Sequence, residues 1–168
     1  ILMATPAIRA LRRRFPDAHL TVMVGQSCRA ALEGNPHVTE SFVIDDRILY
    51  GPSRSARAAM ALGALRRLRG RRFDCVFVCH RDWRFNLLVR LAGIPERYGF
   101  DRNREGIFLT SRFRPSDGYH HIDQYLSVVG LAGVAPDGRQ MDFNVGPKAD
   151  EAADRTFEAL GISSGAAV

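Results

Sequence analysis

Two polar segments carry the side chains best suited to binding a ligand. His80 and Arg81 directly follow the apolar run 75–79, which predicts a strand. A histidine and an arginine at the carboxyl end of a strand can both face a bound molecule. His120 opens a predicted helix over 120–131, and a helix N-terminus favours anions. There a histidine could bond a phosphate or a sugar hydroxyl.

Structural roles explain several of these residues equally well. Asp82 before Trp83 is a good N-cap for a predicted helix over 83–92, which would make the polar loop a solvated cap. For His121 a structural role is favoured over a ligand contact. No further ligands stand at metal-binding spacing from these residues, so the sequence predicts no metal site.

Two arginine clusters are further candidates for binding an anion. The first lies in the aperiodic segment 101–118 and consists of Arg102 and Arg104 with Glu105. The second precedes a predicted helix over 53–69 and consists of Arg47, Arg54 and Arg57. A guanidinium can grip phosphate through two parallel hydrogen bonds, although each cluster also fits a solvated surface.

These residues require a scaffold, and the hydrophobic pattern predicts one of class α/β. Strands are expected at 19–24, 37–44, 75–79, 97–100 and 141–145, and helices over 1–15, 27–32, 53–69, 83–92, 120–131 and 150–160. This alternation predicts a Rossmann-like, open, mostly parallel sheet with flanking helices. A helix entering such a fold usually follows a strand and a loop, so we expect the first strand to precede Ile1.

Composition restricts the partners. The 168 residues carry a net charge of +6, and only one of the 24 basic residues is lysine, which favours an anionic ligand. The basic residues are spread over many elements with little aromatic interleaving, which argues against a nucleic-acid partner. The three cysteines form no CxxC pair, and we expect Cys75 and Cys79 to be buried free thiols in a reduced, cytoplasmic protein.

Five segments in family order resemble the bacterial heptosyltransferases of glycosyltransferase family 9. They are 2–17 (LMATPAIRALRRRFPD), 32–38 (LEGNPHV), 73–76 (FDCV), 97–101 (RYGFD) and 120–126 (HHIDQYL). The resemblance implies half of a GT-B fold, with an N-terminal acceptor-binding domain over 1–146 that is truncated at its start. Residues 147–168 would be the interdomain helix and the start of a donor-binding domain.

The resemblance also implies a reaction. A heptose-like sugar would pass from a nucleotide sugar to an anionic glycolipid acceptor of the lipopolysaccharide-core type, with inversion and without metal or cofactor. The donor would bind mainly to the C-terminal domain, and contact with the inner membrane would be peripheral. The catalytic aspartate of the family would fall just before Ile1, so we expect residues 1–168 alone to be inactive.

The acceptor-binding positions carried over from the family are Arg104, His120, His80, Arg84 and Arg47. In the family pattern Asp123 is the acidic partner of His120, whereas Gln124 replaces a common arginine.

A different class of function fits the same fold. A non-catalytic nucleotide- or phosphate-binding module, either flavodoxin-like or dinucleotide-binding, would also use arginines against phosphate. No GxGxxG or P-loop motif occurs in the sequence, which gives this alternative no direct support.

Overall fold

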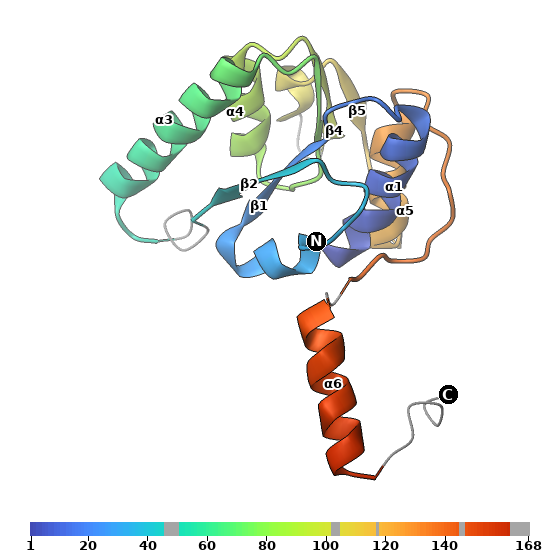
Figure 1. Cartoon of the computed structure of the whole chain (residues 1–168). Coiled ribbons are helices and arrows are strands. Elements are labelled where there is room, and N and C mark those ends of the chain that lie inside the picture. The colour runs from blue at the N-terminus through green and yellow to red at the C-terminus, as the bar shows by residue number, and fades with distance from the viewer. Residues whose placement is uncertain (46–50, 102–104, 117, 145–146, 162–168) are drawn as a thin grey trace.

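A computed structural model describes residues 1–45, 51–101, 105–116, 118–144 and 147–161 of the chain, in which helices and strands alternate (Figure 1). The strands are β1 (Thr21–Gly25), β2 (Glu40–Ile44), β3 (Cys75–Val78), β4 (Glu96–Phe100) and β5 (Ser111–Phe113). The α-helices are α1 (Thr5–Arg14), α3 (Arg54–Arg71), α4 (Trp83–Ala92), α5 (His121–Gly130) and α6 (Pro147–Ala159). The 3-10 helices are η1 (Leu2–Ala4), η2 (Gln26–Leu32) and η3 (Glu105–Phe108).

Every strand pair among the described residues is parallel. β1 pairs with β2, and β4 lies between β3 and β5. Helices α3 and α4 lie on one side of the strands and α1 and α5 on the other (Figure 1). The predicted Rossmann-like α/β class is therefore confirmed, although the described strands form two groups. β1 and β3 each keep one edge without a strand partner within the described residues.

The predicted cap at Asp82 is confirmed, and Ser53 caps α3 in the same way. The Ser53 hydroxyl accepts a hydrogen bond from the amide of Ala56 at 3.2 Å. The Asp82 carboxylate accepts one from the amide of Arg84 at 3.0 Å. Each bond satisfies an amide that the first turn of a helix leaves without an intrahelical partner.

One cluster of buried core residues lies between α1 and α5. Ala7, Ala10 and Leu11 of α1 pack with Ile122, Leu126 and Val129 of α5. The alanines let the two helices approach closely, and burying these apolar surfaces stabilises the pair. This contact fixes the position of the α5 N-terminus.

The predicted strand at 141–145 is wrong, because residues 141–144 contain no strand. This stretch bonds to side chains of α1 instead. The amide of Asp142 donates to the Thr5 hydroxyl at 2.8 Å, and Arg9 donates to the carbonyl of Gln140 at 2.9 Å. Arg9 is buried and also binds the carboxylates of Asp137 and Asp142.

The segment 101–118, expected to be aperiodic, contains η3 and the short strand β5. A three-residue strand is too short to show a hydrophobic period, which is why the sequence did not indicate it. Cys75 is exposed, contrary to the expected burial. All three cysteines are free, as expected.

Helix α6 extends away from the other elements (Figure 1). None of the described helices has the length and apolarity needed to cross a bilayer.

Candidate functional site

The loop after β3 meets the N-terminus of α5. The Nη2 atom of Arg81 lies 2.9 Å from Nδ1 of His121 and 3.4 Å from Oε1 of Gln124. The two polar segments that the sequence singled out are thus adjacent. The side chains that join them are those of Arg81 and His121. Arg81 is the arginine that the sequence analysis placed beside His80 at a strand end, whereas its contact with His121 was not predicted.

His80 and His120 have the same local geometry. Nδ1 of His80 accepts a hydrogen bond from the amide of Asp82 at 3.0 Å, and Nδ1 of His120 accepts one from the amide of Ile122 at 3.3 Å. An imidazole whose Nδ1 accepts carries its proton on Nε2. Both rings therefore carry a hydrogen on Nε2 that can be donated to a ligand. His120 lies at an exposed position, the N-cap of α5.

Burial lowers the pKa of His80 below its ordinary value, against the weaker opposing effect of the Asp82 carboxylate. The ring packs on Phe85, with 4.4 Å between the ring centroids. A lowered pKa keeps this imidazole neutral at pH 7, so that it acts as a hydrogen-bonding group rather than a cation.

Two α5 residues named by the family pattern have other partners. Asp123 accepts a hydrogen bond from Nε of Arg139 at 2.8 Å, and this bond holds the pKa of its carboxyl below the usual value. Gln124 is buried and donates to the carbonyl of Tyr119 at 2.7 Å. Its side chain therefore braces the N-terminus of α5 from inside.

A buried carboxylate organises the segment after β4. Asp101 accepts hydrogen bonds from the amide of Gly106 at 3.1 Å and from Nε of Arg114 at 3.0 Å, and Arg112 lies 3.6 Å away. Burial alone would raise the pKa of Asp101, but the Gly106 amide and the arginines hold it below its usual value. A Cβ at Gly106 would lie 2.8 Å from the Asp101 side chain, so only glycine fits this turn.

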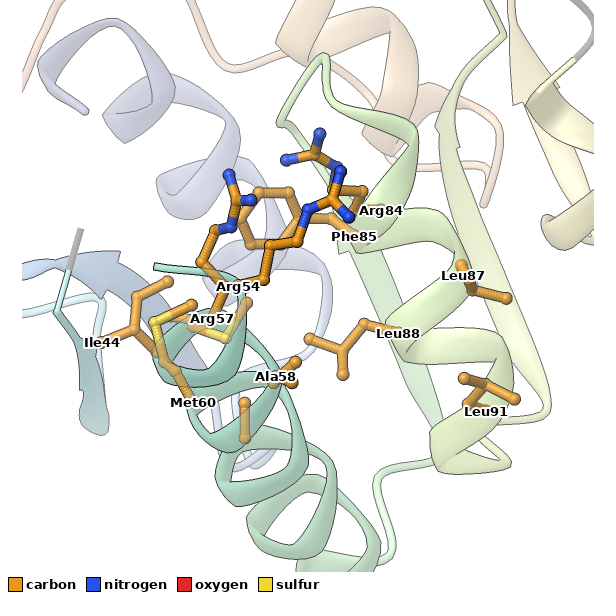
Figure 2. A pocket seen from close by; sticks show the side chains of 13 residues that line it. Ile44, Arg54, Arg57, Ala58, Met60, Arg84, Phe85, Leu87, Leu88 and Leu91 are labelled. Carbon is orange, nitrogen blue, oxygen red and sulfur yellow. The ribbon is translucent and has the colours of Figure 1, made fainter. Parts of the chain in front are cut away.

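Arg84 belongs to a second arginine group and makes no hydrogen bond to Arg81 or His121 among the described residues. Its guanidinium is 3.7 Å from Asp82 and lines a hollow of about 450 Å³ between α3 and α4. Arg54 and Arg57 line the same hollow, and Figure 2 shows the three guanidiniums gathered at one end of it. The other lining residues are apolar.

Two predicted site residues, Arg47 and Arg104, lie outside the described residues. Among the described residues no group of three histidine, cysteine or acidic side chains is arranged to hold a metal ion.

Comparison with known proteins supports a transferase fold. No family model matches the chain. It is 26% identical over 140 residues to lipopolysaccharide heptosyltransferase 3 of Escherichia coli K12, covering 80% of this chain and 39% of that protein. It is also 26% identical over 140 residues to lipopolysaccharide heptosyltransferase 2 of Salmonella typhimurium LT2, covering 80% of this chain and 38% of that protein. The chain spans less than half the length of these relatives.

Solved structures agree on the fold. A family 9 glycosyl transferase from Veillonella parvula superposes with a TM-score of 0.81 at 20% identity, covering 97% of this chain and 46% of that chain. The ADP-heptose lps heptosyltransferase II of E. coli gives a TM-score of 0.69 at 20% identity, covering 97% and 47%. In sequence and in fold, the chain resembles the heptosyltransferases of glycosyltransferase family 9.

Proposed function

We propose that residues 1–146 form the acceptor-binding domain of a glycosyltransferase that moves a heptose-like sugar from a nucleotide sugar onto a lipopolysaccharide-core acceptor. Residues 147–168 would lead into the donor-binding domain. The reaction would invert the anomeric centre without a metal. The enzyme would work in the cytoplasm, at the inner membrane.

One observation supports this proposal most directly. The loop after β3 and the N-terminus of α5 come together through Arg81 and His121 at the carboxyl end of β3. Ligands of open α/β sheets bind at this end of their strands. Together with the fold shared with heptosyltransferases, this site favours a polar, anionic acceptor over a purely structural role.

The proposed chemistry divides between groups. A carboxylate ahead of Ile1 would take the proton from the acceptor hydroxyl, which then attacks the anomeric carbon and displaces the nucleoside diphosphate. The residues of this chain would position the acceptor. His120 would donate from Nε2, and the guanidinium of Arg81 would carry the positive charge that an anionic acceptor requires.

The substitution His120→Asn tests this role. Asparagine is a good N-cap, so the substitution keeps an acceptor for the amide of Ile122 but removes the Nε2 donor. We expect the acceptor KM of the full-length enzyme to rise about tenfold, the cost of one hydrogen bond to a charged group, with the donor KM unchanged. Initial rates with ADP-heptose and a lipopolysaccharide-core acceptor measure both constants.

His19→Asn is the matched control, because His19 is an exposed histidine whose near partner is Glu40. A rise in donor KM alone, or the same effect in the control, would contradict the acceptor role of His120. The proposed function itself fails if the full-length protein releases no nucleoside diphosphate with any heptose donor and acceptor.

A further inference from the structure

Several large apolar side chains of α3 and α4 are exposed to solvent. Leu62 is 45% exposed, Trp83 41% and Leu91 50%. On α4, Trp83, Leu87 and Leu91 follow each other at intervals of four residues and so form one stripe. The buried side of α4 is formed by other residues, including Phe85 and Val89. This stripe is therefore an additional apolar face.

The stripe continues in both directions. Toward α3, Leu87 and Leu91 line the hollow together with Ala58 and Ala61. In the other direction the Trp83 ring stacks on Phe108 with 6.4 Å between centroids, and the neighbouring Ile107 is 70% exposed. On α3, Leu62 lies one helical turn after Ala58 and so borders the hollow that Ala58 lines. We call the set Leu62, Trp83, Leu87, Leu91 and Ile107 the outer apolar face. Contiguous exposed apolar surface of this kind marks an interaction site.

Positive charge stands at one end of this face. Figure 2 shows the guanidiniums of Arg54, Arg57 and Arg84 together at one end of the hollow. No carboxylate lines the hollow among the described residues, and neither Arg54 nor Arg57 has an ion-pair partner there. A partner for this surface must offer hydrocarbon beside negative charge.

We propose that the outer apolar face is a docking surface for an anionic lipid bilayer. Leucine, isoleucine and tryptophan side chains would enter the interface while the arginines contact lipid phosphates. Tryptophan favours the boundary between hydrocarbon and headgroups, and arginine favours bidentate contact with phosphate. This inference extends the proposed function by naming the surface that meets the membrane, but lipid binding is measured without donor or acceptor, so the two can fail separately.

Co-sedimentation of the full-length protein with vesicles tests the apolar part. We expect binding to vesicles of phosphatidylglycerol and phosphatidylethanolamine, and at least tenfold weaker binding to pure phosphatidylcholine. Leu62→Gln combined with Leu91→Gln is expected to weaken binding about tenfold, because two side chains no longer enter hydrocarbon. Met141→Gln, at an equally exposed apolar side chain elsewhere, is the control and is expected to bind as the wild type does.

A second pair of variants separates local charge from net charge. Arg54→Gln with Arg57→Gln is expected to weaken vesicle binding about tenfold or more, at roughly fivefold per arginine near an anionic surface. Arg29→Gln with Arg155→Gln lowers the net charge equally, at exposed positions outside the hollow, and is expected to change binding less than twofold. Equal losses in the two pairs would show nonspecific attraction and overturn the proposal.

Trp83 gives a direct optical readout. The fluorescence difference between wild type and Trp83→Phe is expected to shift to shorter wavelength on vesicle binding. Transfer to a short acceptor without acyl chains is expected to be unchanged in the Leu62→Gln, Leu91→Gln variant. Vesicle binding with no change at Trp83, or no binding to anionic vesicles at all, would overturn the proposal.

Discussion

At the scale of single residues, Asp101 has the most constrained position near the site. It is fully enclosed and holds the Gly106 amide and two arginines at once. These contacts link Asp101 to η3 through Gly106 and to β5 through Arg112. A carboxylate with a lowered pKa in such a position contributes to stability only while it is ionised.

We expect Asp101→Asn to lower the free energy of unfolding by about 2 kcal/mol at pH 7, because the amide cannot replace a charged acceptor for two arginines. The folded pKa lies below the unfolded one, so the contribution is complete above about pH 4 and is lost as the pH falls further. The two proteins should therefore converge in acid. Urea unfolding at several pH values measures the difference, and a constant difference down to pH 2 would contradict this account.

Sequence patterns worked well at this scale for helix caps and poorly for buried charge. Asp82 was identified because capping depends on the local sequence alone. The burial of Arg9 does not follow from local sequence, because its partners, Asp137 and Asp142, lie more than 120 residues away. Arg81 and His121 were missed as a pair for the same reason.

At the scale of elements, the connection between α5 and α6 is held by α1. Thr5 is completely buried; its hydroxyl donates to the carbonyl of Leu2 and accepts from the amide of Asp142, each at 2.8 Å. Alternation of residue types around Met141 favoured a strand, but these tertiary bonds satisfy the backbone without one. The regular elements with a clear hydrophobic period, such as α4 and β3, were predicted within a residue or two.

Thr5→Val is expected to lower the free energy of unfolding by about 1–3 kcal/mol, because it leaves the Asp142 amide without its partner at almost constant volume. Thr156→Val is the control, since that exposed hydroxyl bonds only to the carbonyl of Ala152 in its own helix. Thermal or urea unfolding compares the two. Equal effects would show that the buried bond contributes nothing specific.

At the scale of the molecule, the chain is similar to less than half of each relative. The fold class was predictable because the alternation of elements extends through the whole sequence. The division of the described strands into two groups was not predictable, because it depends on which strands form hydrogen bonds to one another. If the base and the donor domain lie outside residues 1–168, these residues alone transfer no sugar.

The isolated 168-residue chain is thus expected to release no nucleoside diphosphate above the uncatalysed rate, whereas the full-length enzyme does. Measuring diphosphate release for both under identical conditions checks this. Circular dichroism of the isolated chain controls for folding. Sustained turnover by the folded 168-residue chain would place both the base and the donor site within it.

The anchored segment 137–144 also has a mechanical meaning. Its carboxylates and amides bind α1, and Asn144 donates to the carbonyl of Gly34 at 2.9 Å. The segment is therefore held against the domain at several points along its length. We therefore expect a movement of the chain beyond Asn144 to be transmitted to α1 and to the residues that follow η2.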